Sequence, residues 1–343
     1  MAKCILAGLS PFCVLCVLWG QFKAGQPLSR FTFTEPHMGT RFKIIVYARD
    51  ESAAKSAAKS AFQRIADLDG TMSDYRSTSE LMRLCQKAGG DPVQVSDDLF
   101  RVLERSQEVA KLSDGAFDVT IGPVVRLWRQ ARRTHELPDP KTLAQAQELV
   151  GYRNVRLDAK NRTVQLLKPG MRLDLGGIGK GYAADAALAT LKEHRIDRAL
   201  VAAGGDIAVS GPPPDTDGWT IGIAPLLDPD AKPKRYLILH DAAVSTSGDS
   251  EQYLEINGKR HSHIVDPRTG IGLTDRVSVT VVAPKGLIAD PLTKVVSVLG
   301  PERGLAIIEA TDCAAAFVVR KTDRGLVSSE SKRFKDLKQK ESR

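Results

Sequence analysis

The sequence has few cysteines, and most of them lie near its start. Cys4, Cys13 and Cys16 stand within the apolar opening stretch, which leaves only Cys85 and Cys313 for the rest of the chain. Two cysteines are too few for a disulfide framework. We therefore expect two buried thiols rather than a bridge.

Aromatic residues make up only 6% of the chain, and they are not interleaved with basic residues. Zinc-finger spacing is also absent, so the sequence argues against a nucleic-acid-binding module. There is no tandem repeat and no long low-complexity linker. The 343 residues are 42% hydrophobic and 26% charged, which provides a core for one or two domains and excludes wholesale disorder or collagen-like repetition.

Basic residues are concentrated at the end of the chain. The formal net charge is +8, and residues 331–343 hold six Lys and Arg against Asp336 and Glu341. We interpret this segment as a basic, solvated C-terminal tail rather than a nucleic-acid-binding arm. We therefore expect no nucleic-acid partner.

The first 24 residues do not resemble part of a fold. No charge stands between Lys3 and Lys23, and residues 4–20 are almost wholly apolar. Gly, Ser and Pro interrupt this stretch, so its unbroken part is closer to a signal-peptide core than to a full membrane span. Residues 1–24 predict a signal peptide or N-terminal membrane anchor. The protein is then expected to be exported, either periplasmic or attached to the outer face of the inner membrane.

The rest of the chain alternates between helix-like and strand-like patterns. Several short strands follow one another between residues 199 and 265, with helices before and after them. Such clustering is typical of an α+β fold and favours mixed sheets. We expect helices at 51–68, 97–112, 141–150, 178–194, 287–299 and 302–309, and strands at 41–48, 164–167, 172–175, 199–203, 207–209, 219–223, 236–239, 253–256, 263–265, 277–282 and 314–319.

Four segments combine glycine with charged or hydroxyl residues, at 113–123, 174–185, 203–211 and 245–270. We expect them to converge on one site. In the second, Gly176 and Gly177 precede a helix whose backbone amides would suit a phosphate, and Lys180 stands one turn into that helix. The alternative is a tight turn with a surface lysine. A Walker loop is excluded, because Asp174 stands where that motif needs glycine and Gly181 where it needs Ser or Thr.

The fourth segment contains Ser245, His263 and Asp266, which invites a catalytic-triad interpretation. The sequence has no G-x-S-x-G elbow, and such a set arises easily by chance, so we do not favour a serine hydrolase. His263 could act as a base, contact a phosphate or serve a structural role. The residues alone favour the last.

Taken together, the motifs resemble the ApbE family of FAD:protein FMN transferases, in order from about Thr34 to Gly304. Each block alone is weak, but seven in the family's order are hard to obtain by accident. The matching blocks are Met38-Gly39-Thr40, Met72-Ser73-Asp74-Tyr75 with Ser79-Glu80-Leu81, Ser113 to Thr120 with Gly122-Pro123 and Leu127-Trp128, Asp174 to Asp185, Ala203 to Asp206, Thr246-Ser247-Gly248, and His263 to Gly270.

The resemblance implies a T-fold-related α+β catalytic domain over residues 25–330. It also implies magnesium-assisted transfer of the FMN half of FAD to a Thr or Ser hydroxyl of another protein, with release of AMP. Exported or membrane redox flavoproteins carrying such a site would be the partners. Carried over by position, the FAD contacts would be Met38, Tyr75, Ala116, Phe117, Asp118, Asp174, Lys180 and Val265.

The implied metal site departs from the family pattern at one position. The resemblance assigns it a main-chain oxygen of Gly177 and side chains of an A-D-x-x-x-T segment, here 289–294. Asp290 is in place, but Lys294 stands where the threonine is expected, and Thr293 precedes it. Thr293 could supply the oxygen if the helix begins one residue differently. Otherwise Lys294, which cannot ligate magnesium while protonated, could partly replace the metal or mark weakened activity.

The acceptor hydroxyl must also lose a proton during the implied transfer. His263 is the first candidate for that proton or for phosphate stabilisation, and Asp266 is the second. Asp266 could equally cap its own turn. Two other activities stay open: hydrolysis of FAD with water as the acceptor, and non-catalytic flavin binding with a degenerate metal site.

Overall fold

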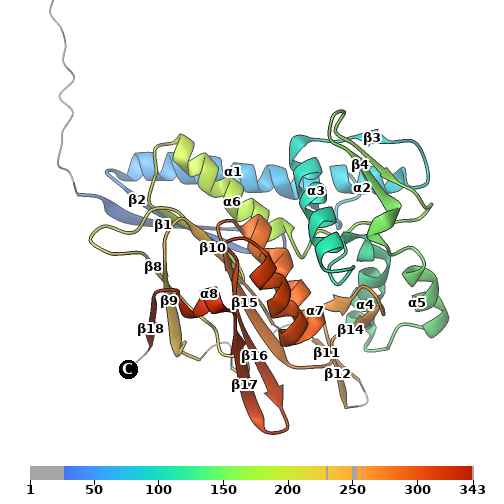
Figure 1. Ribbon diagram of the computed structural model, residues 1–343. Helices are drawn as coiled ribbons and strands as arrows, with labels where there is room; N and C mark the ends of the chain where they lie inside the picture. Colours follow the sequence, from blue (N-terminus) through green and yellow to red (C-terminus); the bar gives the residue numbers. More distant parts are fainter. Residues whose placement is uncertain (1–26, 229–230, 249–252, 257, 342–343) are drawn as a thin grey trace, which may run out of the picture.

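The computed structural model describes residues 27–228, 231–248, 253–256 and 258–341 (Figure 1). Its centre is an eight-stranded sheet in the order β1-β2-β6-β7-β10-β15-β16-β17. These strands are β1 (Ser29–His37), β2 (Thr40–Ala48), β6 (Ala199–Ala203), β7 (Asp206–Val209), β10 (Ala242–Gly248), β15 (Val277–Ala283), β16 (Ala315–Thr322) and β17 (Gly325–Glu330).

The α+β class expected from the sequence is confirmed. The expectation of mixed sheets is wrong, because every strand pair within the described residues is antiparallel. Tight turns join β1 to β2, β6 to β7 and β16 to β17, and a connection that short permits only antiparallel pairing.

Three long helices cover one face of the sheet (Figure 1). Successive side chains of a strand point to opposite faces, so Ile44 of β2 packs in the cluster beneath these helices while Ile45 packs on the other face. Alanines dominate the buried side of the first helix, which lets it lie close to the second. The helices are α1 (Glu51–Met72), α6 (Gly179–Glu193) and α7 (Gly286–Ala310).

A small three-stranded sheet and a short helix cover part of the opposite face. They comprise β8 (Trp219–Gly222), β9 (Arg235–Leu239), β18 (Gln339–Glu341) and α8 (Lys332–Lys335), with strand order β18-β9-β8. Trp219, Leu237 and Phe334 pack there against residues of the central sheet. This layer gives the sheet a second hydrophobic core.

The end of the chain is therefore part of the fold. Phe334 is completely buried, and Arg333 donates hydrogen bonds to main-chain oxygens at the C-terminal end of α7 and just after it, including those of Ile308 and Ala314. A guanidinium at this position also offsets the negative end of the helix dipole. The expectation of a solvated tail is wrong for residues 331–341. Their many basic residues suggested a solvated segment, but Phe334 is buried and holds the segment against the rest of the fold.

The remaining elements lie beside the helical face and at the lower edge of the sheet (Figure 1). Ser79, Ser96 and Asp139 cap helices with their side chains, as such residues commonly do. The elements are α2 (Glu80–Gln86), α3 (Asp97–Leu112), α4 (Gly122–Thr134), α5 (Pro140–Gln147), β3 (Val93–Gln94), β4 (Val155–Asp158), β5 (Thr163–Leu166), β11 (Tyr253–Ile256), β12 (Lys259–Ser262), β13 (Val265–Asp266) and β14 (Ile271–Gly272).

Some local expectations are wrong. Residues 172–175 form no strand, because the Leu173 amide bonds to the Cys85 sulfur and the Asp174 amide to the Val119 carbonyl. The two helices expected on either side of residue 300 are both present, because Gly300 inside α7 is not helical, with φ at +74°. Both described cysteines are free thiols, as expected, but only Cys85 is buried and Cys313 is exposed.

The predicted leader, residues 1–24, lies outside the described residues. Within the part of the chain that is described, no helix has the length and apolar character needed to cross a membrane.

Candidate active site

Direct contacts join the four glycine-dense segments. Phe117 of the first lies against Gly177 of the second, at 3.3 Å from the point where a Cβ on Gly177 would stand. Lys180 of the second forms an ion pair with Asp206 of the third. The amide of Thr246, in the fourth, donates to the carbonyl of Gly205, in the third, at 2.8 Å. The expected convergence is confirmed by these contacts for the first three segments and for Thr246 of the fourth.

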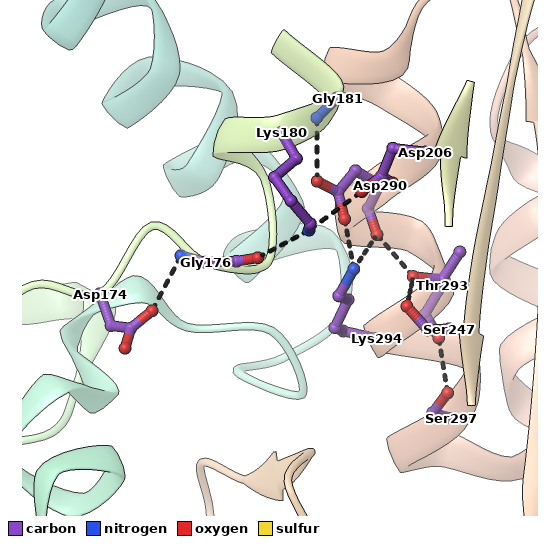
Figure 2. Close-up of polar contacts among 10 residues, drawn as sticks. All are labelled: Asp174, Gly176, Lys180, Gly181, Asp206, Ser247, Asp290, Thr293, Lys294 and Ser297. Carbon is purple, nitrogen blue, oxygen red and sulfur yellow. Dashed lines mark hydrogen bonds and ion pairs between the residues drawn. The ribbon is translucent and has the colours of Figure 1, made fainter. Parts of the chain in front are cut away.

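Lys180 stands in the first turn of α6 and is not a surface lysine. Its Nζ lies 2.9 Å from Asp206 Oδ2 and 3.4 Å from the carbonyl oxygen of Gly176 (Figure 2). Burial alone would lower the pKa of Lys180, but the carboxylates of Asp206 and Asp290 outweigh it and hold the pKa above its ordinary value. The ammonium therefore keeps its positive charge, and 27% of the side chain remains accessible.

The start of α6 meets the start of α7. A Cβ on Gly181 would lie 2.4 Å from the carbonyl oxygen of Gly286, so only glycine permits this approach. The Gly181 amide donates to Asp290 Oδ2 at 3.2 Å. The anion held by this amide is thus the protein's own Asp290 carboxylate, where the sequence suggested a phosphate.

Asp290 is completely buried, and Lys294 forms an ion pair with its Oδ1 (Figure 2). Burial by itself would raise the pKa of Asp290, but the ammonium groups of Lys294 and Lys180 more than compensate and lower it. Lys294 Nζ also lies 3.2 Å from the Asp290 carbonyl oxygen. Asp290 thus connects α6, Lys180 and Lys294.

The Thr293 hydroxyl lies between the Asp290 carbonyl oxygen, which Lys294 also contacts, and Ser247 of β10 (Figure 2). The hydroxyl donates to the Asp290 carbonyl at 2.7 Å and lies 2.7 Å from the Ser247 hydroxyl. The side chain is completely buried. Thr293 therefore fastens α7 to β10.

Arg129 of α4 is a positioning residue that the sequence did not reveal. Its guanidinium forms ion pairs with Asp74 and Asp174, and it lies 4.3 Å from the centre of the Tyr75 ring. Tyr75 is 77% exposed, so one face of this ring is covered while much of the side chain meets solvent. Burial, together with the nearby charge of Asp74, raises the pKa of Asp174 above its ordinary value, against the opposing effect of Arg129.

Other expected flavin contacts are buried to different degrees. Ala116 and Phe117 are buried, and Phe117 lies beside Gly177. Asp118 caps a short 3-10 helix at 119–121, where both its oxygens accept hydrogen bonds from within the protein, including one from the Tyr152 amide at 2.6 Å. These hydrogen bonds give Asp118 a capping role within the protein, and burial raises its pKa.

Met38 and Val265 lie at the edges of this arrangement. Met38 occupies the β1–β2 turn with φ at +48°, a left-handed conformation that is unfavourable for a side chain of this size, and it packs half-buried against the main core. Val265 is buried in a separate cluster with Trp128 of α4.

The segment with His263 docks on α4. Trp128 Nε1 donates to the Gly270 carbonyl at 2.8 Å, and the next residue of α4 is Arg129, which bonds to Asp174. His263 is half-buried between β12 and β13. Asp266 accepts hydrogen bonds from the main chain and guanidinium of Arg268 through both oxygens. Of the two candidates, Asp266 therefore fits the turn-capping role.

Comparison with known proteins identifies the family. The model of the ApbE family matches residues 38–318. The chain is 34% identical over 310 residues to the FAD:protein FMN transferase of Klebsiella pneumoniae, covering 90% of this chain and 95% of that protein. It is 33% identical to the FAD:protein FMN transferase of Haemophilus influenzae, with 88% of this chain and 89% of that protein covered.

The chain belongs to the ApbE family. Solved structures agree: the flavin transferase ApbE from Vibrio cholerae matches with a TM-score of 0.81 at 29% identity, covering 91% of this chain and all of that one. The flavinyl transferase ApbE from Pseudomonas stutzeri, in its apo form, matches with a TM-score of 0.79 at 30% identity, covering 91% and 97%. The resemblance inferred from the motifs is confirmed.

The oxygen donors expected for an ApbE metal site do not fit a divalent ion in this chain. The carboxylate of Asp290 uses one oxygen for Lys294 and the other for the Gly181 amide, and the Thr293 hydroxyl is hydrogen-bonded to the Asp290 carbonyl and to Ser247. A magnesium ion requires several oxygen ligands, and an ammonium beside the same carboxylate repels it. Among the described residues, no group of three or more His, Cys, Asp or Glu side chains is placed to hold a metal.

Two acidic residues of this ApbE-family site were missed as functional residues, although both lie in recognised motifs. Asp206 ends the G-G-D segment and pairs with Lys180. Asp185 ends the glycine-turn motif, and its carboxylate accepts hydrogen bonds from the amides of Gly286 and Leu287 at 2.8 and 2.9 Å. Asp185 thus caps α7 from α6.

We expect Thr293→Val to lower the free energy of unfolding by about 1 to 3 kcal/mol, because it leaves the buried Ser247 hydroxyl without this partner. FAD turnover should stay near the wild-type rate, since Thr293 is enclosed. Urea unfolding and AMP release measure the two effects. Thr134→Val, at an exposed helix position, is the control. A variant that folds stably but needs more magnesium would show that Thr293 binds a metal.

Asp185 should make stability depend on pH. Burial raises its pKa to about 6, against the main-chain hydrogen bonds and Lys285, while Asp290 adds to the rise. The folded state then binds the proton more tightly than the unfolded state, so this stabilisation is present below pH ~4 and is lost as pH rises to ~6. Relative to Asp185→Asn, wild-type protein should lose about 2 to 3 kcal/mol over that range. Parallel urea-unfolding profiles for the two proteins would contradict this.

Proposed function

We propose that this protein transfers the FMN half of FAD to a Thr or Ser hydroxyl of an acceptor protein and releases AMP. The observation that carries the proposal is the placement of Lys180 and Lys294 on both sides of Asp290, next to the glycine turn of 176–177. Family membership supports the choice of FAD, because its relatives include FAD:protein FMN transferases.

The reaction forms a bond between the acceptor oxygen and the phosphorus of the FMN phosphate. It breaks the bond from that phosphorus to the bridging oxygen, which leaves with AMP, and the acceptor proton is lost. Negative charge grows on the phosphate oxygens meanwhile. Fixed positive charges in a partly enclosed site stabilise that charge more effectively than solvent does. Lys180 and Lys294 are the groups we assign to this task.

Arg129 is assigned to positioning. It holds Asp74 and Asp174 together, so it joins the loop of Tyr75 to the segment that leads into the glycine turn. Tyr75, Phe117 and Met38 provide the apolar and aromatic surface that a flavin ring requires. The flavin would then lie on this side of the glycine turn, with its pyrophosphate toward Lys180.

His263 is assigned to the acceptor proton. Asp266 is committed to Arg268, so it is less able to serve as a base. A neutral imidazole can accept a proton from a hydroxyl aligned with phosphorus. The acceptors proposed are exported or membrane redox flavoproteins, with the enzyme periplasmic or held at the outer face of the inner membrane by residues 1–24.

The test is incubation of the purified protein with FAD, with and without a threonine-bearing acceptor. AMP release that requires the acceptor, together with a flavin-labelled acceptor in mass spectrometry, is the expected result. AMP release without any acceptor would indicate FAD hydrolysis instead. Tight FAD binding with no AMP under any condition would indicate a non-catalytic flavin-binding protein and would overturn the proposal.

A further inference from the structure

Lys294 occupies the space between the Asp290 carboxylate and the glycine turn of α6. Its Cε and Cδ lie 3.5 and 3.6 Å from the point where a Cβ on Gly177 would stand, so the alkyl chain packs over that turn. Its ammonium contacts both Oδ1 and the main-chain oxygen of Asp290. Only 17% of the side chain is accessible. The cation is therefore enclosed and fixed by two oxygens of one residue.

These contacts resemble a cation's coordination more than a surface ion pair. The main-chain and side-chain oxygens of Asp290 converge on Nζ (Figure 2). The alkyl chain of Lys294 packs against Gly177. The Gly181 amide uses the remaining carboxylate oxygen. A divalent ion would have to displace the ammonium from the same oxygens, and two cations a few ångströms apart in a poorly solvated site repel strongly.

The charge balance of the site supports the same conclusion. Asp206 is paired with Lys180 and Asp290 with Lys294, whereas Asp174 shares Arg129 with Asp74. The two carboxylates beside Lys180 and Lys294 thus each have a cationic partner supplied by the chain itself. Neither of them is left with an unpaired negative charge that would call for an additional cation.

We propose that the Lys294 ammonium is the resident cation of this site, so that FAD is cleaved without a divalent metal. The inference rests on the proposed transfer function. In that reaction Lys294 forms and breaks no covalent bond and keeps its proton. Its positive charge stabilises the negative charge that grows on the phosphate oxygens while the acceptor oxygen bonds to phosphorus and AMP departs. Lysine supplies one positive charge where magnesium would supply two.

The decisive comparison is between wild type and Lys294→Thr, which restores the threonine expected at this position. Wild-type FMN transfer to an acceptor protein should be unchanged by EDTA within about twofold. Lys294→Thr should lose about 100-fold in EDTA and recover with added magnesium, because an oxygen ligand replaces the repelling charge. Lys294→Met, which has neither charge nor ligand, should lose activity in both conditions. Arg303→Gln, at an exposed position of α7, is the control.

Magnesium binding provides a readout that does not depend on turnover. Equilibrium dialysis with magnesium alone should show no saturable binding to wild type and one site on Lys294→Thr. Circular dichroism checks that each variant is folded.

Wild-type activity that is abolished by EDTA and restored by magnesium, with saturable binding, would overturn this inference and leave the transferase function standing. If no protein releases AMP under any condition, the proposed function fails instead. The dialysis result then still decides whether Lys294 excludes the metal.

Discussion

Lys180→Met should lower FAD turnover by about 100-fold or more, the largest effect on activity that we expect from a single substitution outside Lys294. The substitution keeps the unbranched shape and most of the length of the side chain and removes the charge that lies between Asp206 and Asp290. When this charge is removed, the pyrophosphate of FAD faces the carboxylates of Asp206 and Asp290 with no cation between the negative groups. Steady-state AMP release at saturating FAD measures the loss.

The same variant should also be less stable, because it leaves the nearly buried Asp206 carboxylate unpaired. Breaking a buried ion pair by removing one partner typically costs about 3 to 5 kcal/mol. The double variant Lys180→Met with Asp206→Asn removes the leftover charge and should regain most of that stability without regaining turnover. Lys192→Met, exposed in the last turn of α6, is the control. Recovery of turnover in the double variant would show that Lys180 serves the fold only.

Gly181→Ala should also have a large effect on stability. The new methyl group would lie 2.4 Å from Gly286 O and 2.6 Å from Gly286 C, and main-chain atoms cannot rotate away. α6 and α7 must therefore separate, which stretches the bond from the Gly181 amide to Asp290. Overpacking of this kind costs about 3 kcal/mol. Thermal and urea unfolding measure the loss, and FAD affinity should fall with it.

Gly179→Ala is a matched control for this prediction. It lies on the same helix two residues earlier, and a Cβ there would meet no atom within 4 Å. Replacing a helical glycine with alanine removes flexibility from the unfolded chain and should stabilise by about 0.5 to 1 kcal/mol. Equal destabilisation by both substitutions would show that the close approach of Gly181 to Gly286 is not the cause of the lost stability.

Much of the fold could be predicted from hydrophobic patterns. The helix at 97–112 matches α3 in both bounds, and the strand at 41–48 matches β2 within one residue. Hydrophobic patterns predicted the wrong structure where main-chain amides form hydrogen bonds with distant parts of the chain. The apolar stretch before Asp174 has the composition of a strand, but its amides bond to a carbonyl and a sulfur from other parts of the chain. The solvated tail predicted at the C-terminus is wrong because its six basic residues dominate the composition, although a single aromatic residue, Phe334, packs in the core.

Motifs predicted which segments of the candidate site converge, but not which atoms pair. Asp118 and Thr293 stand in motif positions that suggest ligand contact, yet both use their oxygens within the protein. Arg129 has no motif of its own and is recognisable only once α4 is seen beside Asp174. Such pairings depend on tertiary distances, which one-dimensional spacing does not contain.

The antiparallel sheet also determines when the site can exist during folding. The hydrogen bond from Gly181 to Asp290 spans 109 residues, and the one from Trp128 to Gly270 spans 142. Contacts between such distant residues form slowly, because the entropy cost of closing a long loop comes before the contacts contribute any favourable free energy. We therefore expect the paired charges around Asp290 to assemble late in folding, and a refolding chain to gain its affinity for FAD only after these long-range contacts have formed.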